Sequence, residues 1–157
     1  MKINKAASDV ISAMREKGLT LATAESCTGG GVGHALTSVS GSSSVYLGGV
    51  ISYANAVKEQ VLKVPAEILA TKGAVSYETA YAMAEGVRTL LGADIAVSIT
   101  GIAGPVSDNT QKPVGLVYIG VATEQGITVK ENHFAGDREK VRDQSICTVL
   151  EMILENI

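Results

Sequence analysis

The sequence is poor in several residue types, and each shortage excludes a class of protein. Its 157 residues include no tryptophan, one phenylalanine, two cysteines, two histidines and three prolines. The two cysteines, Cys27 and Cys147, do not make the disulfide framework of a small secreted protein. Two isolated histidines and two distant cysteines also provide no cluster of zinc ligands. We therefore expect no bound metal.

Charge is scarce as well. Charged residues make up 18% of the chain, against roughly a quarter in soluble proteins, which is too few for a disordered or coiled-coil chain. The formal net charge of −3 argues against nucleic acid as a partner, because neutralising phosphates takes clustered Lys and Arg. The sequence shows neither a signal peptide nor an apolar run of about 18 residues. We expect a soluble, cytoplasmic protein with no membrane contact.

Small and aliphatic residues are abundant, with 17 glycines and 46% hydrophobic residues. The length and the absence of a linker-like stretch predict one domain over residues 1–157. Apolar periodicity predicts helices over 3–17, 31–38, 56–63 and 77–91, and another after Asp137. Apolar runs predict strands over 19–24, 46–53, 94–100, 114–122 and 126–134, the last two forming an antiparallel hairpin. This alternation predicts an α/β fold, in which a mixed sheet has helices on both faces.

Polar residues before three of these helices are good helix caps: Asn55, Ser76 and Asp137. In the helix over 77–91, helical spacing places Tyr77 and Tyr81 on the same apolar face as the alanines and Val87.

The junction between the first strand and the next helix is rich in glycine. It reads Glu25-Ser26-Cys27-Thr28-Gly29-Gly30-Gly31. Glycines let the backbone approach a ligand closely, and the helix N-terminus presents unpaired N–H groups to it. Ser26 at such a junction would be displayed to solvent beside oxyanion donors, as in a nucleophile elbow. Alternatively, Ser26 or Thr28 only caps the helix.

Several familiar motifs do not fit this junction. The glycines do not match G-x-G-x-x-G, no Gly-Lys-Ser/Thr follows, and Gly29 stands where Ser-x-x-Lys would need its lysine. A Ser-His-Asp triad would need His34 or His133, which we interpret as surface or packing residues. A serine nucleophile here therefore needs a base other than histidine.

Lys58 is the candidate base, in the segment Ser52-Tyr53-Ala54-Asn55-Ala56-Val57-Lys58. The positive end of the helix dipole and partial burial both disfavour an ammonium, and a neutral amine can take the proton of a serine hydroxyl. Tyr53 could orient that amine or relay the proton. The alternative is that Lys58 is a solvated surface lysine and that Tyr53 packs at the sheet edge.

Several motifs follow one another along the chain. The first is Thr23-Ala24-Glu25-Ser26-Cys27-Thr28-Gly29-Gly30, and others are Gly49-Val50-Ile51-Ser52-Tyr53-Ala54-Asn55 and Thr100-Gly101-Ile102-Ala103-Gly104-Pro105. Lys112-Pro113-Val114-Gly115 and Gly136-Asp137-Arg138 with Arg142 follow in order. Together these motifs resemble the CinA C-terminal domain family, the nicotinamide-nucleotide amidohydrolases. The resemblance implies a three-layer α/β/α sandwich with a mixed, mostly parallel sheet. It also implies hydrolysis of nicotinamide mononucleotide to nicotinate mononucleotide and ammonia, with no cofactor, in a homodimer.

Carried over to this sequence, the resemblance makes Ser26 the nucleophile, Lys58 the base and Tyr53 the assisting residue. It places the substrate against Thr28, Gly29, Gly30, Thr100, Gly101, Ala103, Gly104 and Arg142. Arg138 lies four residues before Arg142, so both side chains are expected on one side of the last helix. The loop over 106–111 has fewer glycines than is usual in the family.

Two other hypotheses stay open from the sequence. One is a non-catalytic nucleotide-binding module, in which the glycine-rich junction holds a phosphate. The other is a hydrolase that uses Cys27 as its nucleophile, activated by the helix N-terminus.

Overall fold

The computed structural model describes residues 2–107 and 110–157, so Asp108 and Asn109 of the loop over 106–111 lie outside the described residues. Its strands are β1 (Leu21–Glu25), β2 (Tyr46–Ile51), β3 (Ile95–Gly101), β4 (Leu116–Thr123) and β5 (Gly126–His133). They form a sheet in the order β2-β1-β3-β4-β5. β1 pairs in parallel with β2 and β3, whereas β4 is antiparallel to β3 and β5. Four of the five strands thus share one direction, and the sheet is mixed and mostly parallel as predicted.

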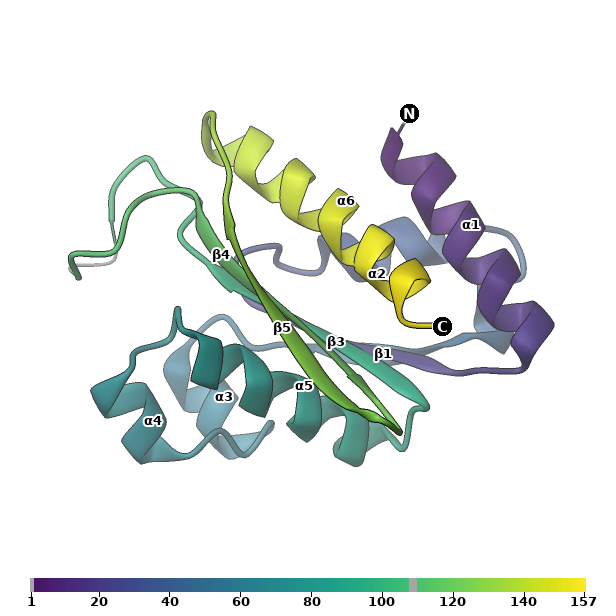
Figure 1. The fold of residues 1–157 in the computed structure, drawn as a ribbon, viewed down its shortest axis with the longest axis horizontal. Helices are drawn as coiled ribbons and strands as arrows, with labels where there is room; N and C mark the ends of the chain where they lie inside the picture. The colour runs from purple at the N-terminus through teal and green to yellow at the C-terminus, as the bar shows by residue number, and fades with distance from the viewer. Residues whose placement is uncertain (1, 108–109) are drawn as a thin grey trace.

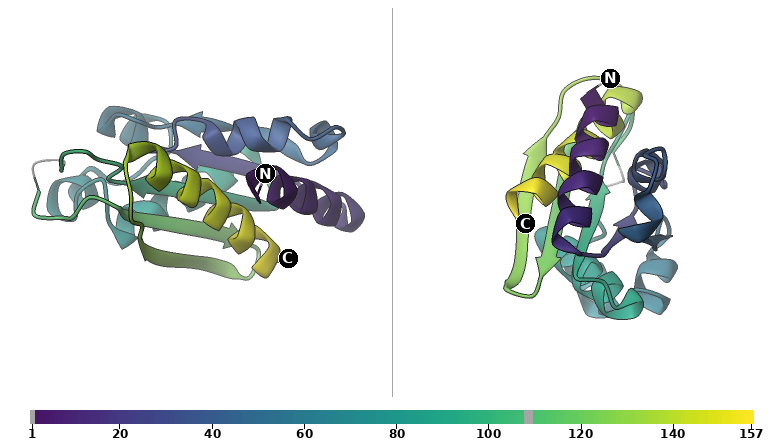
Figure 2. Two further views of the ribbon diagram at one scale, coloured as in Figure 1. Left: turned by 90° about the horizontal axis from the view of Figure 1, so that it is seen from above. Right: turned by 90° about the vertical axis from the view of Figure 1, so that its right-hand side faces the viewer.

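Helices cover both faces of this sheet (Figure 1). They are α1 (Lys2–Lys17), α2 (Gly31–Thr37), α3 (Asn55–Gln60), α4 (Ala66–Thr71), α5 (Tyr77–Leu91) and α6 (Arg138–Glu155), with a short 3-10 turn at Ser42–Ser44. α1, α2 and α6 lie on one face, where α1 and α6 run side by side (Figure 2). α3, α4 and α5 lie on the other. The fold is the predicted α/β/α sandwich.

Two apolar clusters fill the spaces between the layers. Alternate side chains of a strand point to opposite faces of its sheet, and β1 shows this directly. Leu21 belongs to the cluster under α1, α2 and α6, while Ala22 and Ala24 belong to the cluster under α5. Because both faces are covered, the side chains of β1 and nearly all of β3 are buried, as expected for central strands of such a sheet.

Two of the predicted helix caps are confirmed. The Ser76 hydroxyl accepts a hydrogen bond from the Thr79 amide at 3.1 Å, and Asp137 accepts one from the Lys140 amide at 2.9 Å. The predicted hairpin is present, with β4 and β5 joined through Glu124 and Gln125. None of the helices in the described ranges is long and apolar enough to cross a membrane.

Two local predictions are wrong. Asn55 does not cap α3, because the helix begins at Asn55 itself and Ala54 holds the capping position without a side-chain bond. Tyr77 and Tyr81 are exposed, while the buried stripe of α5 is centred on Met83 and Val87. At 100° per residue the two tyrosines lie at and beyond the margin of that stripe, so the sheet meets smaller side chains instead.

Candidate active site

The predicted site residues gather where the parallel strands end. Ser26 follows β1, Ser52 and Tyr53 follow β2, and Thr100 and Gly101 end β3. The connection from β1 to β2 passes through α2 on one face, and the connection from β2 to β3 passes through α5 on the other. Where successive connections diverge in this way, the carboxyl ends of the strands leave a crevice.

A hollow of about 160 Å³ lies in this crevice. It is lined by Ser26, Cys27, Tyr53, Lys58, Ala74, Val75, Thr100, Gly101, Ala103 and Arg138. The lining contains neither a histidine nor a carboxylate, so Lys58 is the candidate base that it offers to a serine. His34 and His133 are exposed, and His133 bonds Glu131 on β5.

Lys58 reaches from α3 into this hollow and is only 1% exposed. Its Nζ lies 3.1 Å from Ser26 Oγ, 2.7 Å from the Ser52 carbonyl oxygen and 3.2 Å from the Tyr53 carbonyl oxygen. An ammonium group has three protons to donate, and these three acceptors take all of them. Burial disfavours the charge and lowers the pKa of Lys58 to about 8.

The two carbonyls also determine how a neutral Lys58 would be oriented. A neutral amine keeps two N–H bonds and one lone pair. With the N–H bonds directed to Ser52 and Tyr53, the lone pair is left for the Ser26 hydroxyl. The arrangement is that of a nucleophile and its base within hydrogen-bond reach.

Ser26 is buried rather than displayed to solvent, which corrects the sequence-based expectation. Its amide donates to the Ile99 carbonyl at 2.9 Å and so continues the pairing of β1 with β3 by one residue. This pairing holds Ser26 between the strand ends, where its side chain lines the hollow. A substrate would therefore have to enter the crevice to reach the hydroxyl.

Glu25 is a buried residue whose part in the site the sequence analysis missed. Its carboxylate is 2% exposed and accepts hydrogen bonds from the Thr28 hydroxyl at 2.7 Å, the Val32 amide at 2.9 Å and the Gly33 amide at 3.0 Å. It thus occupies the N-terminus of α2 that was expected to face a ligand. A phosphate at that helix end would meet a carboxylate, and neither Ser26 nor Thr28 caps the helix. The only sequence signal was an acidic residue ending an apolar strand.

Gly29 and Gly30 shape the turn after Ser26. Their φ angles of +58° and +101° belong to the left-handed region, and a Cβ on Gly30 would lie 3.1 Å from the Ile51 side chain. Neither glycine lines the hollow, and nor does Thr28. In the structure these three residues build the turn after Ser26, and their predicted substrate contacts stay a prediction.

The segment from Thr100 to Gly104 forms a second wall. Thr100, Gly101 and Ala103 line the hollow, and the Thr100 hydroxyl donates to the Ala74 carbonyl at 2.7 Å. A Cβ on Gly101 would lie 2.6 Å from the Val117 side chain, so a glycine there also allows β4 to approach. The Gly104 carbonyl accepts a hydrogen bond from Arg138 at 2.7 Å.

The two arginines of α6 take different positions. Arg142 donates to the carbonyls of Cys27 and Thr28, both at 3.1 Å, and does not line the hollow. Arg138 does line it, and contacts the Tyr53 hydroxyl at 3.3 Å as well as Gly104. Both also line a second hollow of about 470 Å³, together with Glu139, Asp143 and Ile146, so Arg138 lines both hollows.

Tyr53 and Cys27 complete the lining. The Tyr53 side chain is 63% exposed and contacts Arg138, while its backbone carbonyl holds Lys58. Burial raises the pKa of the Cys27 thiol to about 12. Cys27 is thus a protonated thiol at neutral pH, which disfavours it as the nucleophile.

A larger hollow of about 880 Å³ lies elsewhere, bordered by α4, α5 and the chain after α3. The lining of this larger hollow is mostly apolar and contains no serine, cysteine or histidine. The smaller hollow beside Ser26 is therefore the better candidate for an active site. No group of three or more metal-ligating side chains occurs in residues 2–107 or 110–157.

Comparison with known proteins places the chain in a family. The model of the CinA C-terminal domain matches residues 3–157. A CinA-like protein of Geobacter sulfurreducens is 49% identical over 139 residues, which are 88% of this chain and 34% of that protein. One of a Synechococcus strain is 49% identical over 150 residues, 94% of this chain and 36% of that protein. The chain spans about a third of the length of these relatives.

Solved structures agree in fold. The competence/damage inducible protein CihA of Agrobacterium tumefaciens superposes with a TM-score of 0.95 at 39% identity, over 99% of this chain and 95% of that one. A competence-damaged protein (CinA) superfamily protein of Escherichia coli gives 0.96 at 30% identity, over 99% and 90%. Because the family model matches nearly the whole length of this chain, the chain belongs to the CinA C-terminal domain family.

Proposed function

We propose that the chain hydrolyses the carboxamide of nicotinamide mononucleotide to nicotinate mononucleotide and ammonia. The observation that carries the proposal is the buried contact of 3.1 Å between Lys58 Nζ and Ser26 Oγ. The family resemblance of the motifs around these two residues supplies the substrate, and the geometry supports the reaction class, acyl transfer from an amide.

In the proposed mechanism, neutral Lys58 accepts the Ser26 proton while Ser26 Oγ attacks the carboxamide carbon. The backbone N–H of Cys27, which lines the hollow directly after Ser26, would stabilise the oxyanion of the tetrahedral intermediate. Lys58 then returns its proton to the amide nitrogen, the carbon–nitrogen bond breaks, and ammonia leaves. A water molecule attacks the resulting ester, with Lys58 taking and returning one proton, and nicotinate mononucleotide is released from Ser26.

Arg138 lines both hollows, which supports a substrate with an aromatic amide at one end and a phosphate at the other. We place the carboxamide and its ring in the hollow of about 160 Å³ beside Ser26. The ribose phosphate would extend toward the hollow of about 470 Å³ that Arg138 and Arg142 border. Guanidinium groups bind phosphate through charge-assisted hydrogen bonds.

Ammonia release from nicotinamide mononucleotide tests this function. We expect turnover by the wild type, and a loss on the order of 10³-fold or more in Ser26→Ala, as for nucleophiles that act as a unit with their base. Cys27→Ala is the matched control, because it removes a reactive side chain from the adjacent residue. It should keep its rate within about threefold, since a buried protonated thiol has no part in the reaction.

A chelator should leave the rate unchanged in the same assay. A folded wild type that binds the nucleotide without releasing ammonia would make the protein a binding module instead. Loss of activity in Cys27→Ala but not in Ser26→Ala would assign the reaction to the cysteine.

A further inference from the structure

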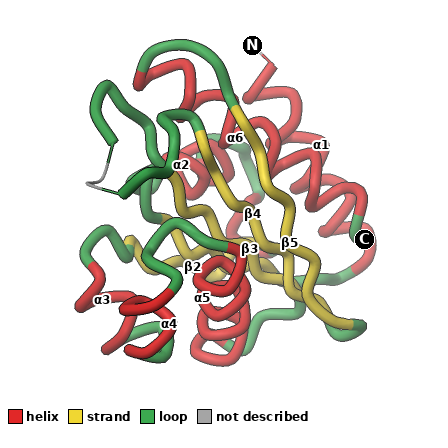
Figure 3. The backbone as a smooth tube through the Cα atoms, turned by 60° about the vertical axis from the view of Figure 1, so that its left-hand side comes forward, coloured by secondary structure: helices red, strands yellow, loops and turns green. Residues whose placement is uncertain are grey.

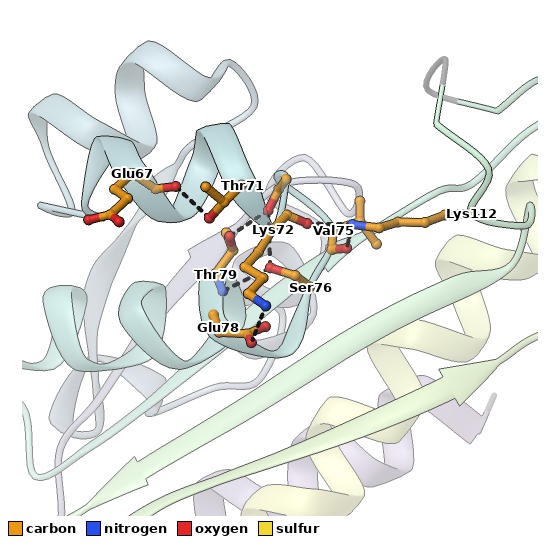
Figure 4. A network of polar contacts seen from close by, with 9 residues as sticks. Glu67, Thr71, Lys72, Val75, Ser76, Glu78, Thr79 and Lys112 are labelled. Carbon is orange, nitrogen blue, oxygen red and sulfur yellow. Dashed lines mark hydrogen bonds and ion pairs between the residues drawn. The ribbon is translucent and has the colours of Figure 1, made fainter.

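The turn over residues 72–76 forms one wall of the Ser26 hollow, through Ala74 and Val75. Side chains bind four successive carbonyls of this turn, and Figure 4 shows Lys112 beside Lys72 and Val75. Lys112 donates to the carbonyls of Lys72 and Val75, Ser76 and Thr79 to that of Gly73, and Thr100 to that of Ala74. Two of these donors, Lys112 and Thr100, come from elsewhere in the fold and help to set the position of this wall.

Lys112 is the donor that comes from the longest loop, the connection between β3 and β4 (Figure 3). Its Nζ lies 2.6 Å from the Lys72 carbonyl oxygen and 2.5 Å from that of Val75. Gly73 has a φ of +85°, and a Cβ there would lie 3.1 Å from this ammonium. The turn thus leaves room for the lysine, and the bonds are charge-assisted.

The same connection contributes Ala103 to the lining of the hollow. Beneath the contact, Val75 packs in a small apolar cluster with Ile102 and Leu116. Lys112 therefore ties the wall at Ala74 and Val75 to the connection that begins with the wall at Ala103. Lys112 itself does not line the hollow, so any effect on a bound molecule must pass through these neighbours.

We propose that Lys112 is a positioning residue that fixes the spacing of these two walls and thereby holds a flat aromatic ring against Ser26. The inference rests on the proposed function, because it takes Ser26 to be the nucleophile. It goes beyond that function by assigning the shape of the ring site to a lysine outside the hollow. The rate at which a small aliphatic reagent labels Ser26 should not depend on the wall spacing, whereas the rate of an aromatic reagent should.

The test compares Lys112→Met with Lys72→Met. The first substitution keeps the aliphatic stem and removes the bonds to the turn. The second makes the same change in the same turn, but Lys72 Nζ only pairs with Glu78 at 4.0 Å on the surface. Rates of Ser26 labelling would be measured with phenylmethylsulfonyl fluoride and with a methyl fluorophosphonate, together with kcat and KM for nicotinamide mononucleotide.

We expect Lys112→Met to slow labelling by the aromatic reagent, and to lower kcat/KM, by about tenfold, the scale of one or two charge-assisted bonds. Labelling by the methyl reagent and both rates of Lys72→Met should stay within about twofold of the wild type. Lys112→Arg, which keeps two donors and the charge, should recover most of the aromatic rate. Should Lys112→Met fail to fold, Lys112→Gln is expected to show the same selective loss in smaller measure.

The outcomes separate the two proposals. Equal slowing of both reagents in Lys112→Met, or no slowing of either, overturns the positioning role. In another outcome, the aromatic reagent alone labels Lys112→Met more slowly than the wild type, and the wild type releases no ammonia. That result would support the positioning role and overturn the proposed substrate. A wild type in which neither reagent labels Ser26 overturns the nucleophile and this inference together.

Discussion

Burial acts on two neighbouring side chains of the hollow in opposite directions. It lowers the pKa of Lys58 to about 8 and raises that of Cys27 to about 12. Both shifts favour the neutral form, because a buried charge loses its hydration. A neutral amine is a base, whereas a neutral thiol is a poor nucleophile. The same physical cause therefore supports Lys58 as the base and argues against Cys27 as the nucleophile.

The pH dependence of the reaction follows from the lowered pKa of Lys58. Because the base must be deprotonated, kcat/KM should rise with pH and level off above an apparent pKa of about 8. At pH 7 only about a tenth of the enzyme would hold the neutral amine. The measurement is kcat/KM for nicotinamide mononucleotide between pH 6 and 10 in the wild type.

Lys58→Arg is the matched variant for this profile. It keeps a cation near Ser26, but a guanidinium does not act as a base in this range, so the rate should fall by about 10³-fold. An arginine variant with substantial activity would reduce Lys58 to an electrostatic role. Tyr53→Phe should lose far less, because Lys58 is bound by the Tyr53 backbone carbonyl, which the substitution leaves in place.

Residue chemistry alone could indicate Ser26 and Lys58, because a serine at a glycine-rich turn without histidine calls for another base. It could not indicate Glu25. The role of that carboxylate depends on α2 folding back so that the amides of Val32 and Gly33 meet it, which no local pattern records. The burial of Ser26 likewise depends on pairing with Ile99, more than seventy residues away in the sequence.

At the scale of elements, α6 braces the site with two side chains one turn apart. Residues four apart share a side of a helix, as the sequence predicts for Arg138 and Arg142. Arg142 holds the backbone of the turn after Ser26, and Arg138 reaches both hollows and the Gly104 carbonyl. We therefore propose a phosphate contact for Arg138 and a positioning role for Arg142, and the phosphate contact that the family resemblance gives to Arg142 stays a prediction.

Arginine-to-alanine variants separate these roles. Arg138→Ala should raise KM for nicotinamide mononucleotide by about ten- to a hundredfold, the scale of a charge-assisted phosphate contact, with little change for nicotinamide riboside, which lacks the phosphate. Arg142→Ala should lower kcat for both substrates, because the turn that holds Ser26 loses two hydrogen bonds. Steady-state kinetics with both substrates gives the comparison. The reverse pattern would return the phosphate contact to Arg142.

Elements were more predictable than their arrangement. The hairpin of β4 and β5 follows from two apolar runs around a short polar turn, and the caps at Ser76 and Asp137 follow from local chemistry. The position of β1 between β2 and β3 is a property of long-range pairing that periodicity does not encode. That position is nevertheless what brings Ser26, Lys58 and Thr100 together.

For the whole molecule, the same burial that makes Lys58 a base opposes folding. In the unfolded chain the amine has its ordinary pKa of 10.5, and in the fold about 8. Below pH 8 the Lys58 amine is protonated in both states. In the unfolded chain water solvates its charge, whereas in the folded chain the charge is buried and disfavoured. The fold is destabilised there by at most about 3 kcal/mol, since one pKa unit is about 1.4 kcal/mol. Functional sites commonly carry such a penalty.

The free energy of unfolding should therefore rise with pH in the window between the two pKa values, about 8 to 10.5. In this window the unfolded state binds more protons than the folded state, which gives the slope its positive sign. Denaturant titrations of the wild type and Lys58→Met at several pH values measure it, because the difference between the two proteins isolates the contribution of the Lys58 amine. The difference between the two should change by up to about 3 kcal/mol across the window and be constant between pH 6 and 7. A difference that does not vary with pH would mean that Lys58 has the same pKa in both states, and the amine would then be too basic to serve Ser26 at neutral pH.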